Sequence, residues 1–118
     1  MGVLSYDMKV DLADNHSTPT EILTMLSMDK SWDVRNKVAK NPNTPTEILA
    51  ILSKDEAFYV KNSVAMNLHT PKKVLAKLSK DKDWRIRYSV TMNPNAPKNI
   101  LAILSTDKNY YVRDSCSR

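Results

Sequence analysis

Apolar residues recur along this chain in two short stripes, and the pair of stripes repeats every 26 residues. Residues 41–66, NPNTPTEILAILSKDEAFYVKNSVAM, align without a gap onto residues 15–40, 67–92 and 93–118. In each copy a stripe with helical spacing is followed by a polar turn and then by a second helical stripe. A fixed period of this length indicates stacked repeats, in which each unit is covered by its neighbours.

The first half of each unit predicts a short helix. Leucine fills the ninth and twelfth unit positions and an aliphatic residue the eighth, so three apolar side chains share one face. Thr-Pro-Thr-Glu precedes the stripe at residues 18–21 and 44–47. Threonine is a good N-cap, proline suits the first helical position, and the glutamate completes a capping box. We therefore expect these threonines to cap the first helices.

The second half of each unit predicts another short helix, which begins at an aromatic residue. In the first unit Trp32 is followed by Val34 and Val38, whose spacing of four residues is typical of a buried stripe. Helices of about nine residues are marginal in isolation, so they must bury their stripes against adjacent units. The sequence therefore predicts an all-α solenoid, in which some segments could be 3₁₀.

The first fourteen residues match the second half of a unit. Tyr6 takes the aromatic position and Lys9 the basic one, while three aspartates lie between the apolar residues. A polar half-unit is what the end of a repeat stack requires, because the first full unit would otherwise expose its apolar side. We predict one domain, residues 1–118, with a capping half-repeat at 1–14 and repeats at 15–40, 41–66, 67–92 and 93–118.

The unit Asn-Pro-Asn-Thr-Pro-x-x-x-Leu-x-x-Leu-Ser-x-Asp, ending in Val-Arg/Lys-x-x-Val-Ala, resembles the leucine-rich repeat variant family. Its second half is similar to HEAT repeats. The resemblance covers residues 15–118 and implies a right-handed superhelix of short α and 3₁₀ segments without a sheet. One member of the family carries an iron–sulfur cluster on N-terminal cysteines, but residues 1–14 contain no cysteine, so we expect no cofactor. HEAT-like relatives include DNA-binding glycosylases, yet no catalytic residue of theirs has a counterpart here.

The composition argues against several classes of protein. No apolar run approaches the roughly 20 residues that cross a bilayer, and the acidic N-terminus lacks the features of a secretory signal. The single cysteine, Cys116, excludes an internal disulfide and a cysteine metal site. His16 and His69 stand at unequal unit positions, and no catalytic triad, phosphate loop or zinc spacing is present. We expect a cytoplasmic protein that is not an enzyme and binds neither membrane nor metal.

Charge is concentrated in the third unit, residues 67–92. The chain as a whole has a net charge of +5. The basic residues of the third unit are Lys72, Lys73, Lys77, Lys80, Lys82, Arg85 and Arg87, against Asp81 and Asp83. Such a patch could meet an acidic partner or nucleic acid, or it could be an ordinary solvated face.

A basic residue also stands six positions after an aspartate in every unit. The pairs are Asp29 and Arg35, Asp55 and Lys61, Asp81 and Arg87, and Asp107 and Arg113. The bases could line a surface as contacts for acidic groups. We favour a structural interpretation, in which each base pairs with an aspartate of its own or the neighbouring unit.

Aromatic residues supply the candidate binding site. The aromatics that open the second helices, Trp32, Phe58, Trp84 and Tyr110, are expected to pack between units, although they could also stack on bases. Tyr59, Tyr88 and Tyr111 are expected to be exposed, and Arg85 shares a unit position with Tyr59 and Tyr111. Tyrosine mixed with arginine is the usual composition of a binding hot spot. The predicted partner-binding residues are Tyr59, Arg85, Tyr88, Tyr111, Arg87 and Lys61.

These patterns favour a non-enzymatic scaffold whose curved surface binds another protein. The alternative is nucleic-acid binding through the basic third repeat and the adjoining Arg/Lys ladder, which predicts affinity that falls steeply with salt. The last unit ends in Cys116-Ser117-Arg118 where others have Val-Ala-Lys or Val-Ala-Met. We therefore expect a monomer, or weak self-association through this C-terminal repeat.

Overall fold

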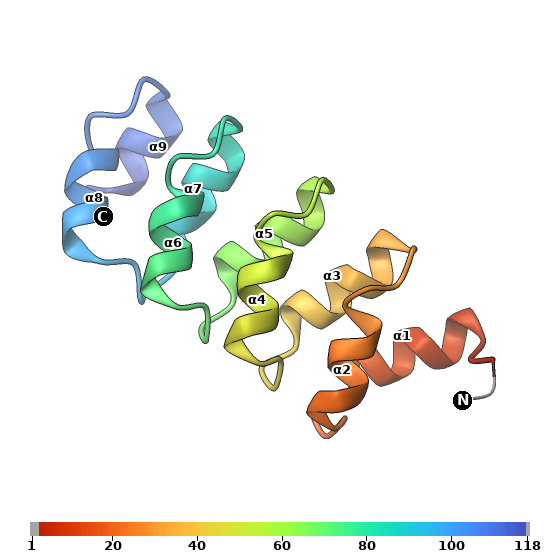
Figure 1. The fold of residues 1–118 in the computed structure, drawn as a ribbon. Helices are drawn as coiled ribbons and strands as arrows, with labels where there is room; N and C mark the ends of the chain where they lie inside the picture. The colour runs from red at the N-terminus through yellow and green to blue at the C-terminus, as the bar shows by residue number, and fades with distance from the viewer. Residues whose placement is uncertain (1–2, 118) are drawn as a thin grey trace.

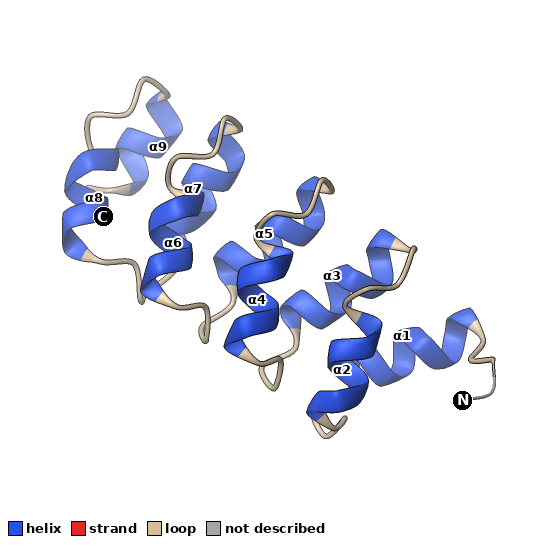
Figure 2. Cartoon of the chain, viewed as in Figure 1, coloured by secondary structure: helices blue, strands red, loops and turns tan. Residues whose placement is uncertain are grey.

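The chain folds into an elongated helical solenoid with extents of 51 × 20 × 19 Å, as described for residues 3–117 by a computed structural model (Figure 1). The helices are α1 (Tyr6–Asp14), α2 (Thr20–Leu26), α3 (Trp32–Lys40), α4 (Thr46–Leu52), α5 (Phe58–Met66), α6 (Lys72–Leu78), α7 (Trp84–Met92), α8 (Lys98–Leu104) and α9 (Tyr110–Ser115). Across residues 3–117 the structure contains no strand, and the helices are all α rather than 3₁₀ (Figure 2). The predicted all-α class is confirmed.

The helices fall into two rows that follow the sequence alignment. The first helices of the units, α2, α4, α6 and α8, form one row, and α3, α5, α7 and α9 form the other (Figure 1). Helix α1 begins at Tyr6 and packs on α3 at the head of the second row, as the alignment of the N-terminal segment predicts. Second helices pack directly on one another along the axis, α2, α4 and α6 each pack between two helices of that row, and α8 packs on α7.

The core runs along the axis of the solenoid rather than forming one central cluster. Leu23, Leu49 and Leu75 of the first helices are fully buried, as are Val38 and its equivalents in the next two second helices. Each of these side chains lies between two neighbouring units, so helices of six to nine residues persist by packing rather than by intrinsic propensity. Leu101, at the same unit position as these leucines, is only partly buried.

A ladder of asparagines ties each unit to the one before it. Asn67 donates its Nδ2 protons to the Ala39 and Asn41 carbonyls, at 2.8 and 3.3 Å, and its Oδ1 accepts the His69 amide. Asn41 and Asn93 form the same three kinds of bond. The amides thereby satisfy carbonyls at helix ends that have no partner within their own helix. The asparagine that opens each of these units thus bridges backbone groups of neighbouring units.

The predicted capping box is wrong. Thr44 is buried and donates its hydroxyl proton to the Val38 carbonyl at 2.6 Å, instead of accepting an amide of α4. The N-cap is Pro45, whose extended backbone precedes the helix, and the Glu47 carboxylate bonds the Thr46 hydroxyl. The reason is burial between units: the carbonyl at the end of the preceding second helix needs a donor, and the threonine is the group in place to supply it.

Candidate functional site

A ladder of ion pairs crosses every boundary between successive second helices. Its rungs, which we call the cation–aspartate ladder, are Lys9–Asp29, Arg35–Asp55, Lys61–Asp81 and Arg87–Asp107. Each base binds the aspartate that lies 20 residues later, in the next unit, at 2.7–2.8 Å. The same aspartates also accept a hydrogen bond from the backbone amide two residues later in the chain, as Asp55 does from Ala57 at 2.9 Å. One side chain therefore shapes its own turn and anchors the preceding unit.

Hydrogen bonding and burial set the ionisation of these aspartates. The Arg87 guanidinium lowers the pKa of Asp107 below its ordinary value, outweighing the effect of burial. Burial raises the pKa of Asp55, but bonds from Arg35 and the Ala57 amide together outweigh it and leave the pKa lowered. Asp55 and Asp107 are thus held in the charged form that the pairing requires.

The ladder accounts for two of the predicted partner-binding residues. Arg87 is buried, and besides Asp107 it bonds the Asp81 and Lys82 carbonyls at 2.8 and 3.1 Å. Lys61 is half-buried against Asp81. The structural interpretation is therefore confirmed for Arg35, Lys61 and Arg87, with the neighbouring unit supplying the aspartate. Arg113 of the last unit instead donates to the backbone carbonyl of Asp107 at 2.7 Å. Neither Arg87 nor Lys61 presents a free charge at the surface.

A row of stacked side chains runs along the N-terminal ends of the second helices. We call it the stacked row, and its pairs are Trp32–Tyr59, Phe58–Arg85 and Trp84–Tyr111. The ring centroids of Trp32 and Tyr59 lie 5.1 Å apart with 23° between their planes, and those of Trp84 and Tyr111 lie 5.4 Å apart at 25°. The guanidinium carbon of Arg85 lies 3.9 Å from the centre of the Phe58 ring.

All three pairs use the same two unit positions. The aromatic residue that opens one second helix lies against the residue that follows the aromatic of the next second helix. Tyr6, which opens α1, and Asp33, which follows Trp32 on α3, occupy the same two positions, and there the Tyr6 hydroxyl donates a hydrogen bond to the Asp33 carboxylate. The expected packing of these aromatics between units is thus observed, yet it takes place at the surface, where Trp32 stays 46% and Tyr59 58% exposed.

The stacked row continues down the exposed face of α5 and α7. On α5 this face carries Tyr59 and Met66, and on α7 it carries Arg85 and Met92, at spacings that place each pair on one side of its helix. Met66 and Met92 are 47% and 42% exposed. Because α5 packs directly on α7, the two faces form one surface, which with the stacked row we call the second-helix face.

Tyr88 is less accessible than the sequence predicts. It is half-buried, packs against the hydrophobic core and meets the Trp84 ring edge-on at 6.3 Å. The prediction that Tyr88 is exposed is wrong because its helical position falls between the exposed face and the boundary with the neighbouring unit. The other predicted contacts, Tyr59, Arg85 and Tyr111, are exposed and lie in one row.

Sequence reasoning missed Trp32, Met66 and Met92 as members of this surface. The tryptophan was expected to be covered, and the methionines close their helices where the other units have charged residues. The available signal was the helical spacing of Met66 from Tyr59 and of Met92 from Arg85.

The third unit separates its cations into paired and unpaired groups. Arg87 and Arg85 bind Asp107 and Asp83. The lysines Lys72, Lys73, Lys77, Lys80 and Lys82 are exposed, and between residues 3 and 117 no ion pair involves them. The predicted basic patch is therefore made by lysines of α6 and the turn after it rather than by the repeated arginines.

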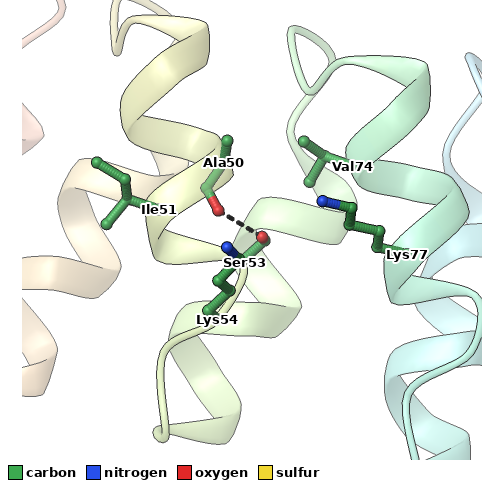
Figure 3. Close-up of a pocket in the computed structure, with 6 residues that line it drawn as sticks. All are labelled: Ala50, Ile51, Ser53, Lys54, Val74 and Lys77. Atoms are coloured by element: carbon green, nitrogen blue, oxygen red, sulfur yellow. Dashed lines mark hydrogen bonds between the residues drawn. The ribbon is translucent and has the colours of Figure 1, made fainter.

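One of these lysines faces a hollow between α4 and α6. The hollow has a volume of about 370 Å³ and is lined by Ala50, Ile51, Ser53, Lys54, Val74 and Lys77 (Figure 3). The Lys77 side chain extends from α6 toward α4, and the Ser53 hydroxyl is occupied by a bond to the Ala50 carbonyl. We refer to this site as the lysine hollow.

The two histidines and the cysteine are the other residues considered in the sequence. His16 and His69 line one shallow hollow together with Lys40, although they come from different unit positions. Cys116 packs against the core, and burial raises the pKa of its thiol, while Arg118 lies outside the described residues. Across the described part of the chain, no three acidic, histidine or cysteine side chains form a group that could hold a metal ion. Nor does any helix in residues 3–117 have the length and apolar character to cross a membrane.

Comparisons with known proteins return no match: no protein-family profile, curated protein or solved structure is significantly similar to this chain.

Proposed function

We propose that this chain is a non-enzymatic repeat scaffold of the cytoplasm that binds another protein through its second-helix face. The observation that carries the proposal is the stacked row, which keeps large side chains exposed in fixed positions. Tyr111 and Tyr59 are each 58% exposed, although the rings of Trp84 and Trp32 stack on one face of their rings. Aromatic side chains held in place before binding lose little conformational entropy when a partner covers them.

The composition of the surface favours a protein partner. Tyrosine, tryptophan, methionine and arginine are the residue types enriched in the cores of protein interfaces, and all four meet on α5, α7 and α9. A contiguous exposed patch of large side chains on a small protein is typical of an interaction site. The resemblance of the repeat to the leucine-rich repeat variant and HEAT-like families is consistent with a scaffold, since solenoids present extended surfaces to their partners.

Nucleic-acid binding through the third repeat and the ladder has less support. A nucleic-acid groove needs unpaired cations next to exposed rings. In this structure Arg35, Lys61 and Arg87 are neutralised by aspartates, and Arg85 forms a 2.7 Å ion pair with Asp83. The cations of the stacked row and of the ladder therefore carry little net attraction for phosphates.

The test is peptide selection on the purified chain. A phage-displayed random peptide library is panned on the wild type, and the enriched peptides are measured against the triple variant Y59A/R85A/Y111A. We expect at least about a hundredfold loss of affinity, because hot-spot truncations each cost about 2 kcal/mol or more. Tyr88 is left unchanged because it packs on the core.

A matched control changes exposed apolar residues elsewhere on the chain. Met28, just after α2, and Ile103 of α8 are 77% and 63% exposed, so M28A/I103A removes similar apolar surface away from both the second-helix face and the lysine hollow. This variant should bind the selected peptides like the wild type, and circular dichroism should be the same for all three proteins. An equal loss of peptide affinity in both variants, or no loss in the triple variant, would contradict the proposal.

A further inference from the structure

The lysine hollow combines an apolar wall with two cations. Val74 of α6 and Ala50 of α4 supply the apolar wall between the helices (Figure 3). Lys54, just after α4, and Lys77 of α6 stand at its edges, and both side chains are exposed. An aliphatic group bound here would have the Lys54 and Lys77 ammonium groups near it on opposite sides.

The positive charge of the hollow is not balanced by any ion pair within residues 3–117. The ladder bases each hold an aspartate, whereas Lys54 and Lys77 take part in no ion pair over that range. Lys73 adds a third cation one helical turn before Lys77, and like charges at that spacing destabilise a helix. Glu47 is the acidic residue of α4, and its carboxylate bonds the Thr46 hydroxyl instead. An anion that binds here would therefore reduce the repulsion among these lysines.

The lining selects among anions. No aromatic side chain lines the hollow, so it offers no surface on which a base could stack. Its Ala50, Ile51 and Val74 side chains instead suit an aliphatic group. The geometry points to an acidic peptide segment of a partner protein as the occupant, with an aliphatic side chain in the hollow and flanking carboxylates on Lys54 and Lys77. This is a second interface, separate from the second-helix face.

The test is fluorescence anisotropy with the full chain. The probe is a labelled synthetic peptide with a central leucine flanked on both sides by aspartates. Its reference is the same peptide with glycine in place of leucine. We expect the leucine peptide to bind at least about tenfold more tightly than the glycine peptide, a difference of about 1.4 kcal/mol. Binding of both should weaken with salt, since exposed charges are screened.

Two variants separate the charge from the apolar wall. K54E/K77E should weaken binding of the leucine peptide at least about tenfold, whereas K30E/K108E, which changes two exposed lysines elsewhere, should have a much smaller effect. A50L partly fills the hollow from a half-exposed position and should abolish the preference for leucine over glycine. The Y59A/R85A/Y111A variant should bind the acidic peptide normally, so failure of one proposal is distinguishable from failure of the other.

Three outcomes would overturn the inference. One is equal affinity for the leucine and glycine peptides. Another is equal loss of binding in K54E/K77E and K30E/K108E. The third is tighter binding of a single-stranded oligonucleotide of matched charge than of the leucine peptide, which would assign the lysines to phosphates.

Discussion

Arg87 and Asp107 form a two-point ion pair across the boundary between α7 and the turn before α9. Nε of Arg87 lies 2.8 Å from Oδ2 of Asp107, and Nη2 lies 3.0 Å from Oδ1. Both side chains are less than a tenth exposed. Parallel bonds of this kind between guanidinium and carboxylate fix orientation as well as distance, so the pair sets how one unit sits on the next.

Neutralising this rung should destabilise the chain more than neutralising a more exposed one. Asp107→Asn leaves the buried Arg87 charge without its partner, and we expect a loss of about 2–4 kcal/mol in the free energy of unfolding. Asp29→Asn is the matched control, because its partner Lys9 is 28% exposed and can be solvated. Urea unfolding followed by circular dichroism measures both. Equal losses would show that burial of the rung does not decide its contribution.

The same rung predicts a dependence of stability on pH. The pKa of Asp107 is lowered in the folded chain, chiefly by the bond from Arg87. An aspartate with a lowered folded pKa stabilises the fold above its unfolded value of about 3.9 and loses that contribution as the pH falls through the folded pKa. As the pH is lowered from about 5 to about 3, the urea concentration at the midpoint of unfolding of the wild type should therefore decrease.

Asp107→Asn provides the comparison for the acid effect. The variant starts less stable, and its midpoint should fall less over the same pH range because this carboxylate is no longer there to protonate. Parallel curves for the two proteins would mean that Asp107 makes no contribution to the acid response.

Removing one step of the asparagine ladder should also destabilise the stack. Asn67→Ala leaves the Ala39 carbonyl and the His69 amide without their side-chain partner, and it removes one of two bonds to the Asn41 carbonyl, which keeps the Thr44 amide. We expect a loss of about 3 kcal/mol, because buried polar groups left unsatisfied are costly. Asn15→Ala is the control, since Asn15 is exposed and within residues 3–117 its side chain bonds only the Ser17 amide. If both variants unfold at the same urea concentration, the ladder bonds are not stabilising.

The stacked row should show measurable coupling between units. A double-mutant cycle of Trp84→Ala and Tyr111→Ala should give an interaction of about 0.5–1.5 kcal/mol, the value of a stacked aromatic pair. A cycle of Trp32→Ala and Tyr111→Ala should give nearly none, because their rings do not stack on each other. Thermal or urea unfolding of the single and double variants supplies both numbers. Coupling of the same size in the two cycles would contradict direct stacking as its source.

Much of the fold follows from the repeat alone. A stripe that recurs every 26 residues predicted the alternation of short helices, and the equivalence of Tyr6 with Trp32 placed α1 on α3. The repeated aspartate and base predicted a ladder, although the spacing within a unit left open which unit supplies the aspartate. That choice depends on how far one unit is displaced from the next, and this displacement is set by packing.

The candidate site was less accessible to sequence reasoning. A tyrosine that replaces polar residues at an equivalent position is expected to be exposed, and Tyr59 and Tyr111 are. Tyr88 is not, because side chains of that unit position lie close to the next second helix. The threonines failed as caps for a related reason: local propensity favoured an N-cap, but burial between units decided the hydrogen bond instead.

The bonds of the ion-pair and asparagine ladders have a further consequence for how such a chain can change in evolution. They join residues 20, 26 or 28 positions apart, so each unit is tied only to its neighbours. Duplicating or deleting one complete unit would leave every remaining bond with an equivalent partner. The length of the rod could therefore vary by whole units while its core stays the same, and exposed residues such as Tyr59 could diverge one unit at a time.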